Sequence, residues 1–187
     1  GDRIALRMAA EAPDDVPPQE MPLHILYEDP HLLVLDKPAG IVVHPTKGHY
    51  DNTLANGVIH HWMKLGESHR FRPVHRLDKD TSGVLAVAKN PYVHQQLAEQ
   101  MKRGRIGKRY IAFVRGVPSP ASGTIDAPIG RDPAAPHIRI VTPDGYPSVT
   151  HYATEAVYGG GRAAKVALAP ETGRTHQIRV HMRHIGC

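Results

Sequence analysis

Short runs of apolar residues, many of them alternating with polar ones, predict β-strands over much of the chain. Two such runs, 23–27 and 31–36, are separated by a Glu-Asp-Pro turn and predict a β-hairpin. A third run, 84–88, is almost wholly apolar. Further strands are expected at about 107–115, 137–142, 148–158 and 162–169. The last three are separated by glycine-rich turns, so we expect an antiparallel meander.

The strand at 107–115 carries apolar residues on both faces, with Tyr110, Ala112 and Val114 on one face and Ile111 and Phe113 on the other. A strand that is apolar on both faces is typical of the interior of a sheet. We therefore expect this strand to be buried on both sides.

Three helices are predicted from apolar residues at helical spacing. The first covers about 53–65, capped by Asp51 or Asn52, and Trp62 is expected in its buried face. The second begins at Asn90-Pro91, a typical N-cap and first-turn pair. The third lies within 172–185 and is entered at Thr175.

These elements predict an α+β fold with a mixed, mostly antiparallel sheet flanked by helices. Residues 1–8 resemble a single strand, and 9–22 are rich in proline and acidic residues. We interpret 1–8 as the tail of an upstream unit, 9–22 as a linker and 23–187 as the main domain.

Composition favours a polyanionic partner, because the 187-residue chain carries a formal charge of +5. Its single cysteine, Cys187, cannot form an intrachain disulfide, which suits a reducing cytoplasm. No apolar run approaches the roughly 20 residues needed to span a bilayer. No secretory signal is visible, and no membrane partner is expected.

The most concentrated polar stretch runs from His75 to Gly83 and leads into the apolar strand at 84–88. Its Asp78 and Asp80 form a D-x-D pair, which suits acid–base chemistry or a divalent metal. The simpler alternative is turn capping by carboxylate and hydroxyl groups. The residues alone leave these alternatives open.

Histidines near the C-terminus do not predict zinc. His181 and His184 share a helical face, but His176 lies off it, and neither a thiolate nor a carboxylate cluster accompanies them. Basic residues, in contrast, gather just before and within the strand at 107–115 and again near the third helix, as a phosphate backbone requires. They are Lys102, Arg103, Arg105, Lys108, Arg109, Arg174, Arg179 and Arg183. Few aromatic residues are present, so base stacking on an aromatic platform is not expected.

The stretch 75–83, His-Arg-Leu-Asp-Lys-Asp-Thr-Ser-Gly, resembles the active-site motif of the RluA-type pseudouridine synthases. Three further stretches resemble motifs of that family in the same order: 37–45 upstream, then 108–112 and 172–181. The resemblance covers about 23–186.

The resemblance implies an isomerase that converts uridine in RNA to pseudouridine without cofactor or metal. By position, Asp78 would be the catalytic aspartate, Tyr110 would help remove the C5 proton of the base, and Arg174 would pair with Asp78. Arg76 would enter the RNA stack in place of the flipped uridine. His75, Lys108 and Arg109 would contact RNA, while Asp80 and the residues after it would shape the turn.

The family also implies ribosomal RNA, of the large subunit, as the substrate of a cytoplasmic monomer. Residues 1–8 would be the remnant of an N-terminal S4-like RNA-binding domain, and the catalytic domain would be incomplete at its C-terminus. The alternative is a non-catalytic RNA-binding or ribosome-assembly protein on the same fold. A glycoside hydrolase using the D-x-D pair is disfavoured, since aromatic sugar platforms are missing.

Overall fold

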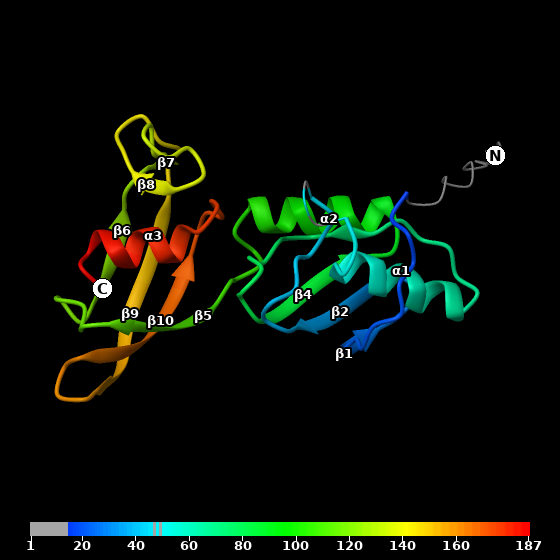
Figure 1. Ribbon diagram of the computed structural model, residues 1–187, viewed down its shortest axis with the longest axis horizontal. Coiled ribbons are helices and arrows are strands. Elements are labelled where there is room, and N and C mark those ends of the chain that lie inside the picture. Colours follow the sequence, from blue (N-terminus) through cyan, green and yellow to red (C-terminus); the bar gives the residue numbers. More distant parts are fainter. Residues whose placement is uncertain (1–14, 47, 49) are drawn as a thin grey trace, which may run out of the picture. The chain divides into compact units, whose positions relative to one another are not determined.

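The computed structural model describes residues 15–46, 48 and 50–187 (Figure 1). The chain forms two compact units, the first ending at Gln100 and the second beginning at Met101. Every strand pairing in the described chain is antiparallel, and three helices accompany the strands. The predicted α+β class is confirmed. The region that we expected to form one domain is divided between the two units.

The first unit contains a four-stranded sheet with the order β1-β2-β4-β3. Its elements are β1 (Ile25–Glu28), β2 (Leu32–Lys37), α1 (Leu54–Lys64), β3 (Arg72–Pro73), β4 (Gly83–Ala88) and α2 (Pro91–Lys102). The predicted hairpin is β1-β2. Alternate residues of β2 and β4, such as Leu33, Leu35, Leu85 and Val87, are fully buried. Trp62 is 1% exposed, which confirms its predicted place in the core.

Both helices of this unit begin at side-chain caps. Thr53, rather than Asp51 or Asn52, is the N-cap of α1, so that prediction was wrong. Thr53 and Asn56 cap each other's backbone N–H groups, a reciprocal arrangement that neither earlier residue forms here. For α2 the prediction is confirmed, because the Val93 N–H donates to Asn90 Oδ1 at 2.9 Å.

Residues 15–22, the described part of the expected linker, lie against α1. Val16 is buried, the Gln19 N–H donates to the Asn56 carbonyl at 3.0 Å, and Asn56 Nδ2 donates to the Pro17 carbonyl at 2.9 Å. This segment is therefore fixed to the first unit. Residues 1–14, which include the expected S4-like remnant, lie outside the described residues.

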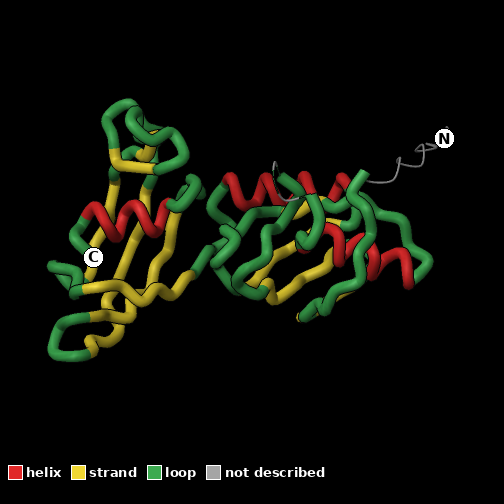
Figure 2. The backbone as a smooth tube through the Cα atoms, in the orientation of Figure 1, coloured by secondary structure: helices red, strands yellow, loops and turns green. Residues whose placement is uncertain are grey.

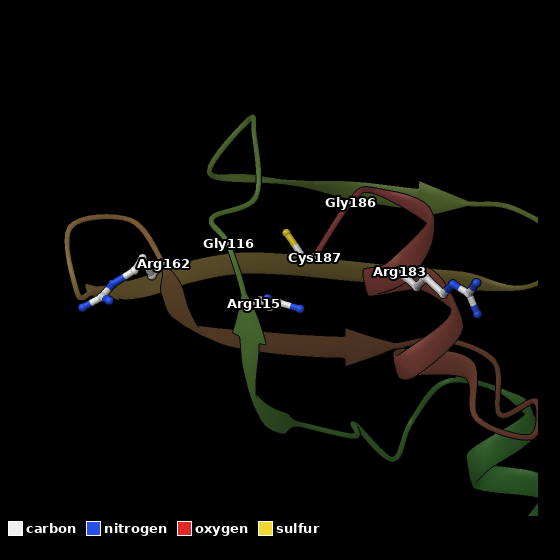
Figure 3. A pocket seen from close by; sticks show the side chains of 6 residues that line it. All are labelled: Arg115, Gly116, Arg162, Arg183, Gly186 and Cys187. Atoms are coloured by element: carbon white, nitrogen blue, oxygen red, sulfur yellow. The ribbon is translucent and has the colours of Figure 1, made fainter.

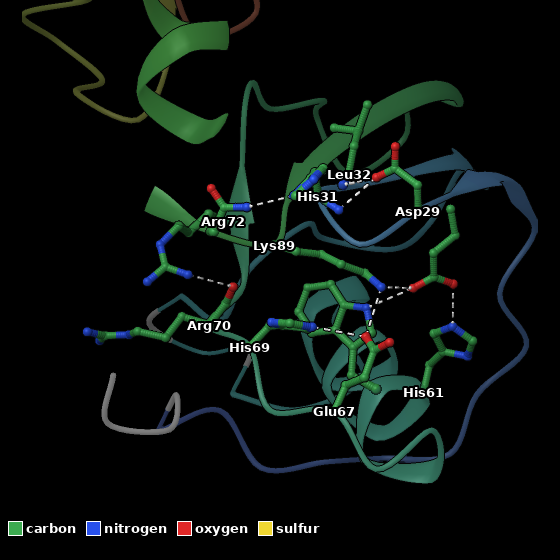
Figure 4. Close-up of polar contacts among 12 residues, drawn as sticks. Asp29, His31, Leu32, His61, Glu67, His69, Arg70, Arg72 and Lys89 are labelled. Atoms are coloured by element: carbon green, nitrogen blue, oxygen red, sulfur yellow. Dashed lines mark hydrogen bonds and ion pairs between the residues drawn. The ribbon is translucent and has the colours of Figure 1, made fainter. Parts of the chain in front are cut away.

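A buried ionic cluster links β1, α1 and the end of β4 (Figure 4). The Lys89 ammonium group, with a side chain only 2% exposed, lies 2.8 Å from carboxylate oxygens of both Glu28 and Glu67. Glu28 also accepts a hydrogen bond from Trp62 Nε1 at 3.1 Å and lies 2.8 Å from His61. The cation is thus paired on two sides, as a buried charge requires.

The second unit has a four-stranded sheet of order β5-β10-β9-β6 and a separate β7-β8 pair. The elements are β5 (Tyr110–Arg115), β6 (Ser122–Asp126), β7 (Ile129–Arg131), β8 (Arg139–Val141), β9 (Val149–Tyr158), β10 (Ala163–Pro170) and α3 (Gln177–His184). Helix α3 covers one face of the four-stranded sheet, where Met182 packs among Val166 and Leu168 (Figure 1). This face holds the core of the unit.

Three predictions for the second unit were wrong in detail. Strand β5 lies at the edge of its sheet, and the side chains of Ile111 and Phe113 are 51% and 73% exposed. The sequence shows that this face of the strand is apolar, but it does not show whether another element covers the face. Strand β8 pairs with β7, so only β9-β10 realises the expected meander. Helix α3 begins at Gln177 rather than Thr175, because His176 adopts the left-handed conformation with φ 57°.

In the described part of the chain, no helix combines the length and apolarity needed to cross a membrane.

Candidate active site

Asp78 lies in the loop between β3 and β4, a segment without regular secondary structure (Figure 2). Leu77 is 8% exposed and anchors the loop in the core, whereas Asp78 is half-buried and Asp80 is exposed. The Thr81 N–H donates to the Asp78 carbonyl at 3.1 Å, closing a turn directly after Asp78. The loop therefore presents Asp78 at the start of a tight turn, between a buried anchor and β4.

Hydrogen bonds from Lys37, the last residue of β2, hold the Asp78 loop in place. Lys37 is fully buried, and its ammonium group donates to the carbonyls of Pro38 at 2.8 Å, Ile41 at 2.8 Å and Lys79 at 3.0 Å. The Gly40 N–H donates to the same Lys79 carbonyl at 2.9 Å. The segment after β2 and the residue after Asp78 are thus joined through one cation.

The electrostatics of Lys37 reflect this position. Burial lowers the pKa of Lys37, and the negative charges of Asp80 and Asp78 oppose that effect without cancelling it. All three ammonium hydrogens have carbonyl acceptors, so the buried cation is satisfied by hydrogen bonds rather than by direct pairing with a carboxylate. The ammonium group of Lys37 therefore supplies a buried positive charge that acts on Asp78 and Asp80.

His75 and Arg76 precede Asp78 in the same loop. His75 is half-buried and Arg76 is exposed. An exposed guanidinium two residues before the candidate catalytic carboxylate has the freedom to contact a ligand outside the protein.

In the second unit, Tyr110 is the first residue of β5, pairs with Leu168 of β10 and packs against the core of that unit. Lys108, two residues earlier, is half-buried, and its ammonium group donates to the carbonyls of Glu171 at 3.2 Å and Thr172 at 3.0 Å. Burial lowers the pKa of Lys108. Lys108 thus ties the start of β5 to the segment that carries Arg174, while Arg109 beside it is exposed.

Arg174 has an exposed side chain that is steadied at two points. Its Nε donates to the Pro147 carbonyl at 3.3 Å, and its guanidinium lies 5.4 Å from the ring centroid of Tyr146. Its backbone N–H donates to the Gln177 side-chain oxygen at 2.9 Å. The backbone of Arg174 is therefore held by the first residue of α3.

Gln177 is the centre of a buried polar network. Its oxygen accepts from the Thr172 hydroxyl at 2.8 Å as well as from Arg174, and its nitrogen donates to the Val149 carbonyl and the Thr150 hydroxyl, each at 3.0 Å. All four hydrogen-bonding positions of the amide are used. The network joins β9 to the segment that precedes α3.

The network continues to His181, which is fully buried. Nε2 lies 3.0 Å from the Ala127 carbonyl, which can only accept, so this nitrogen carries the hydrogen. Nδ1 then accepts from the Thr150 hydroxyl at 2.9 Å. Burial lowers the pKa of His181. Both ring nitrogens are engaged within the protein, and no group of three metal-ligating side chains occurs among the described residues.

The sequence-predicted catalytic residues are divided between the units. Asp78, together with His75 and Arg76, belongs to the first unit, and Tyr110, Arg174, Lys108 and Arg109 belong to the second. Within the second unit, Tyr110 and Arg174 lie on segments that Lys108 joins. Each unit thus carries some of the candidate residues.

Sequence reasoning did not identify the structural roles of Lys37 and Gln177. A signal for Lys37 was present, because it continues the alternation of Leu33 and Leu35 on the buried face of β2. A charged residue on a core face is a functional candidate. Gln177 offered no comparable signal, because two of its four partners, Val149 and Thr150, are brought to it only by the fold.

The model of the family described as RNA pseudouridylate synthase matches residues 31–184. The chain belongs to this family. The match includes the Asp78 loop, Tyr110 and the segment from Thr172 to His181.

Individual relatives agree with this assignment. The chain is 44% identical over 186 residues to ribosomal large subunit pseudouridine synthase D of Pseudomonas aeruginosa, covering 100% of this chain and 57% of the relative. It is 41% identical over 186 residues to an uncharacterized RNA pseudouridine synthase of Bacillus subtilis, YhcT, covering 100% of this chain and 62% of that protein. The chain therefore spans about three fifths of the length of these relatives.

A solved structure is similar as well. Human RNA pseudouridylate synthase domain containing 1 matches with a TM-score of 0.72 and 29% identity, covering 94% of this chain and 69% of the human chain.

Proposed function

We propose that this chain is catalytic and isomerises uridine to pseudouridine in RNA, with ribosomal RNA of the large subunit as the substrate. Support comes from family membership and from relatives named as ribosomal large subunit pseudouridine synthases. The observation that carries the proposal is the loop that presents Asp78, fastened through the buried ammonium group of Lys37. A reacting carboxylate needs such fixed support.

In the proposed reaction, Asp78 acts as the catalytic carboxylate while the uracil is detached from ribose C1′, turned and rejoined through C5. The C1′–N1 glycosidic bond breaks and a C1′–C5 bond forms; the C5 proton is then removed, and N1 of the base ends protonated. The reaction requires neither a redox partner nor a metal. The hydroxyl of Tyr110 is assigned to removal of the C5 proton, and the guanidinium of Arg174 to pairing with Asp78.

The target uridine has to leave its stack, which costs a few kcal/mol. Arg76 is assigned to the vacated space, because a planar guanidinium both stacks and pairs with neighbouring groups. Its exposure beside Asp78 supports this role. His75 and Arg109 are assigned to the surrounding RNA. Lys108 keeps its assignment to RNA contact, although its ammonium group also bonds to two protein carbonyls.

The proposed setting is a cytoplasmic monomer of the subgroup that carries an S4-like domain. A cytoplasmic location is consistent with the ribosomal large subunit named for the relatives. The S4-like element would lie within residues 1–8, and the strand-like sequence of these residues supports it.

The proposal is tested by Asp78→Asn, with Asp80→Asn as the matched control. Both substitutions remove one carboxylate from the same loop, but Asp80 is exposed and has no assigned part in the reaction. Pseudouridine is measured by mass spectrometry after incubation with unmodified large-subunit ribosomal RNA. We expect no product from Asp78→Asn, near-normal product from Asp80→Asn and RNA binding by both.

Two outcomes would contradict the proposal. Substantial turnover by Asp78→Asn would remove Asp78 from the mechanism. If the unsubstituted chain binds RNA but forms no pseudouridine on any ribosomal RNA, the alternative of a non-catalytic RNA-binding protein on this fold is favoured.

A further inference from the structure

The second unit has an open groove of about 490 Å³ between the β7-β8 pair and α3. The polar side chains of its lining are all basic. Its polar side chains are Arg139, Arg179, Arg183, His137, His176 and His184, and its remaining lining residues are apolar. Among the residues that the structure describes, no carboxylate lines this groove.

The arginines come from both walls of the groove. Arg139 is half-buried on β8, and its Nη1 donates to the Pro136 carbonyl at 3.1 Å, which holds its guanidinium in place. Arg179 and Arg183 are one helical turn apart on α3, so they share a face, and both are exposed. In the described part of the chain neither forms an ion pair or a side-chain hydrogen bond. Two guanidinium groups are therefore available to an external anion.

We propose that this groove binds the phosphate backbone of the substrate RNA next to the reacting nucleotide. The inference rests on the proposed function. Guanidinium groups pair with phosphates in a bidentate manner, and a lining without carboxylates adds no repulsion. The groove also adjoins the candidate site in the same unit, since His176 lines it and Arg174 lies two residues earlier in the chain.

A second cationic pocket, of about 680 Å³, is less suited to this role (Figure 3). It is lined by Arg115 and Arg162 together with Arg183. Arg162 donates from Nε to the Gly159 carbonyl at 2.9 Å, and Figure 3 shows Arg162 and Arg183 at opposite ends, with their guanidinium groups pointing apart. These charges do not converge on one anion.

Two double variants distinguish RNA binding by the groove from RNA binding by the second pocket. Arg139→Gln/Arg179→Gln removes two charges from the groove alone, and Arg115→Gln/Arg162→Gln removes two from the other pocket alone, leaving Arg183 in place in both. Binding to a fluorescently labelled uridine-containing RNA hairpin is measured over a range of salt concentrations. The single variant Arg179→Gln is included because its exposed side chain has no hydrogen-bond or ion-pair partner among the described residues.

We expect the groove variant to bind on the order of tenfold more weakly at about 0.1 M salt, with the slope of log K against log salt reduced by about 1 for each phosphate that is no longer neutralised. Arg179→Gln should show about half of that reduction in slope, and the control variant should bind like the unsubstituted chain. Unchanged affinity and slope in both groove variants would overturn the inference. So would a larger fall in affinity in the control variant.

A poly-glutamate peptide in the same assay identifies the class of anion. If it binds the unsubstituted chain as tightly as RNA does, and the groove variants weaken both equally, the assignment to RNA is overturned. The outcome is independent of turnover. The groove variants could bind RNA more weakly while the unsubstituted chain forms no pseudouridine. That result would contradict the proposed function but would still support RNA binding by the groove.

Discussion

The buried ammonium group of Lys37 donates a 3.0 Å hydrogen bond to the backbone carbonyl of Lys79, the residue that follows Asp78. This contact joins residues far apart in the sequence and fixes the loop immediately beside the candidate catalytic carboxylate. The same ammonium group holds the Pro38 and Ile41 carbonyls. The geometry of the Asp78 loop therefore depends on a side chain that contacts no solvent.

The first prediction is that Lys37→Met lowers the rate of pseudouridine formation by at least about tenfold, equivalent to about 1.4 kcal/mol in the activation barrier. The substitution removes the ammonium donor from three carbonyls, of which the Lys79 carbonyl keeps its bond from the Gly40 N–H, and so loosens the Asp78 loop. It also removes a costly buried charge. Turnover is measured on unmodified ribosomal RNA, and stability by urea unfolding.

Lys79→Met is the matched control for Lys37→Met. It removes the same charge from an exposed side chain and leaves the backbone carbonyl of residue 79 in place. Its turnover should remain close to normal. Equal turnover by the two variants would show that the hydrogen bonds beneath the loop do not matter for the reaction.

The second prediction concerns Gln177→Leu, which removes four hydrogen bonds while keeping a side chain of similar volume. Unpaired buried groups should cost about 1–3 kcal/mol of unfolding free energy. Turnover should fall further than stability explains, because the Arg174 backbone loses its acceptor. Val166→Ala, a core substitution on β10, controls for general destabilisation, and a matching fall in its turnover at low temperature would refute the positioning role.

The third prediction concerns Tyr110→Phe, which keeps the ring that packs in the second core and removes only the hydroxyl. Loss of a proton-transfer group typically costs about 10²–10⁴ in rate. We expect the glycosidic bond to break and the reaction to stop before pseudouridine is released. Nucleoside mass spectrometry distinguishes these stages. Tyr158→Phe, exposed on β9, should behave normally, and normal yield from Tyr110→Phe would exclude its hydroxyl from the reaction.

The fourth prediction concerns stability in acid and rests on Glu28. Burial would raise the pKa of Glu28, but hydrogen bonds from Lys89 and His61 outweigh it and hold the pKa below its usual value of 4.5. The folded pKa is therefore lower than the unfolded one. The stabilisation is complete above the usual carboxyl pKa and is lost as the pH falls through the lowered value.

Glu28→Gln should cost on the order of 1–3 kcal/mol of unfolding free energy at pH 7, and should lose less additional stability than the unsubstituted chain when the pH falls below 4.5. Urea unfolding across this range measures both effects. Glu20→Gln, which breaks only an exposed pair with Lys64, should change the curve little. If the unfolding free energies of Glu28→Gln and the unsubstituted chain fall in parallel with pH, the lowered pKa of Glu28 does not account for the acid sensitivity.

The fold was predictable where local pattern and burial coincide. The alternation of β2 and the run of β4 identify central strands, and Asn90-Pro91 marks the start of α2. The pattern failed for β5, because Ile111 and Phe113 are as apolar as core residues yet lie on an exposed face. It also missed the pairing of β8 with β7, since pairing partners depend on contacts that a single strand does not encode.

The candidate site was predictable as a set of motifs but not as a supporting structure. The family motifs indicate Asp78, Tyr110 and Arg174 directly. The contacts that hold them in place are not part of the motif pattern: Lys37 bonds to the carbonyl beside Asp78 from 42 residues away, and Gln177 bonds to the Arg174 backbone from three residues further along the same motif. Both act on backbone atoms, whose positions no sequence motif specifies.

The hydrogen bond between Lys37 and the Lys79 carbonyl also has a consequence for mutational tolerance. An ammonium group that recognises main-chain oxygens is indifferent to the side chains that those residues carry. Many amino acids at positions 41 and 79 can therefore accept these hydrogen bonds through their backbone carbonyls, whereas a substitution at position 37 removes the donor. In a saturation scan, intolerance would be concentrated on the donor, and the three acceptor positions would vary according to their own surroundings.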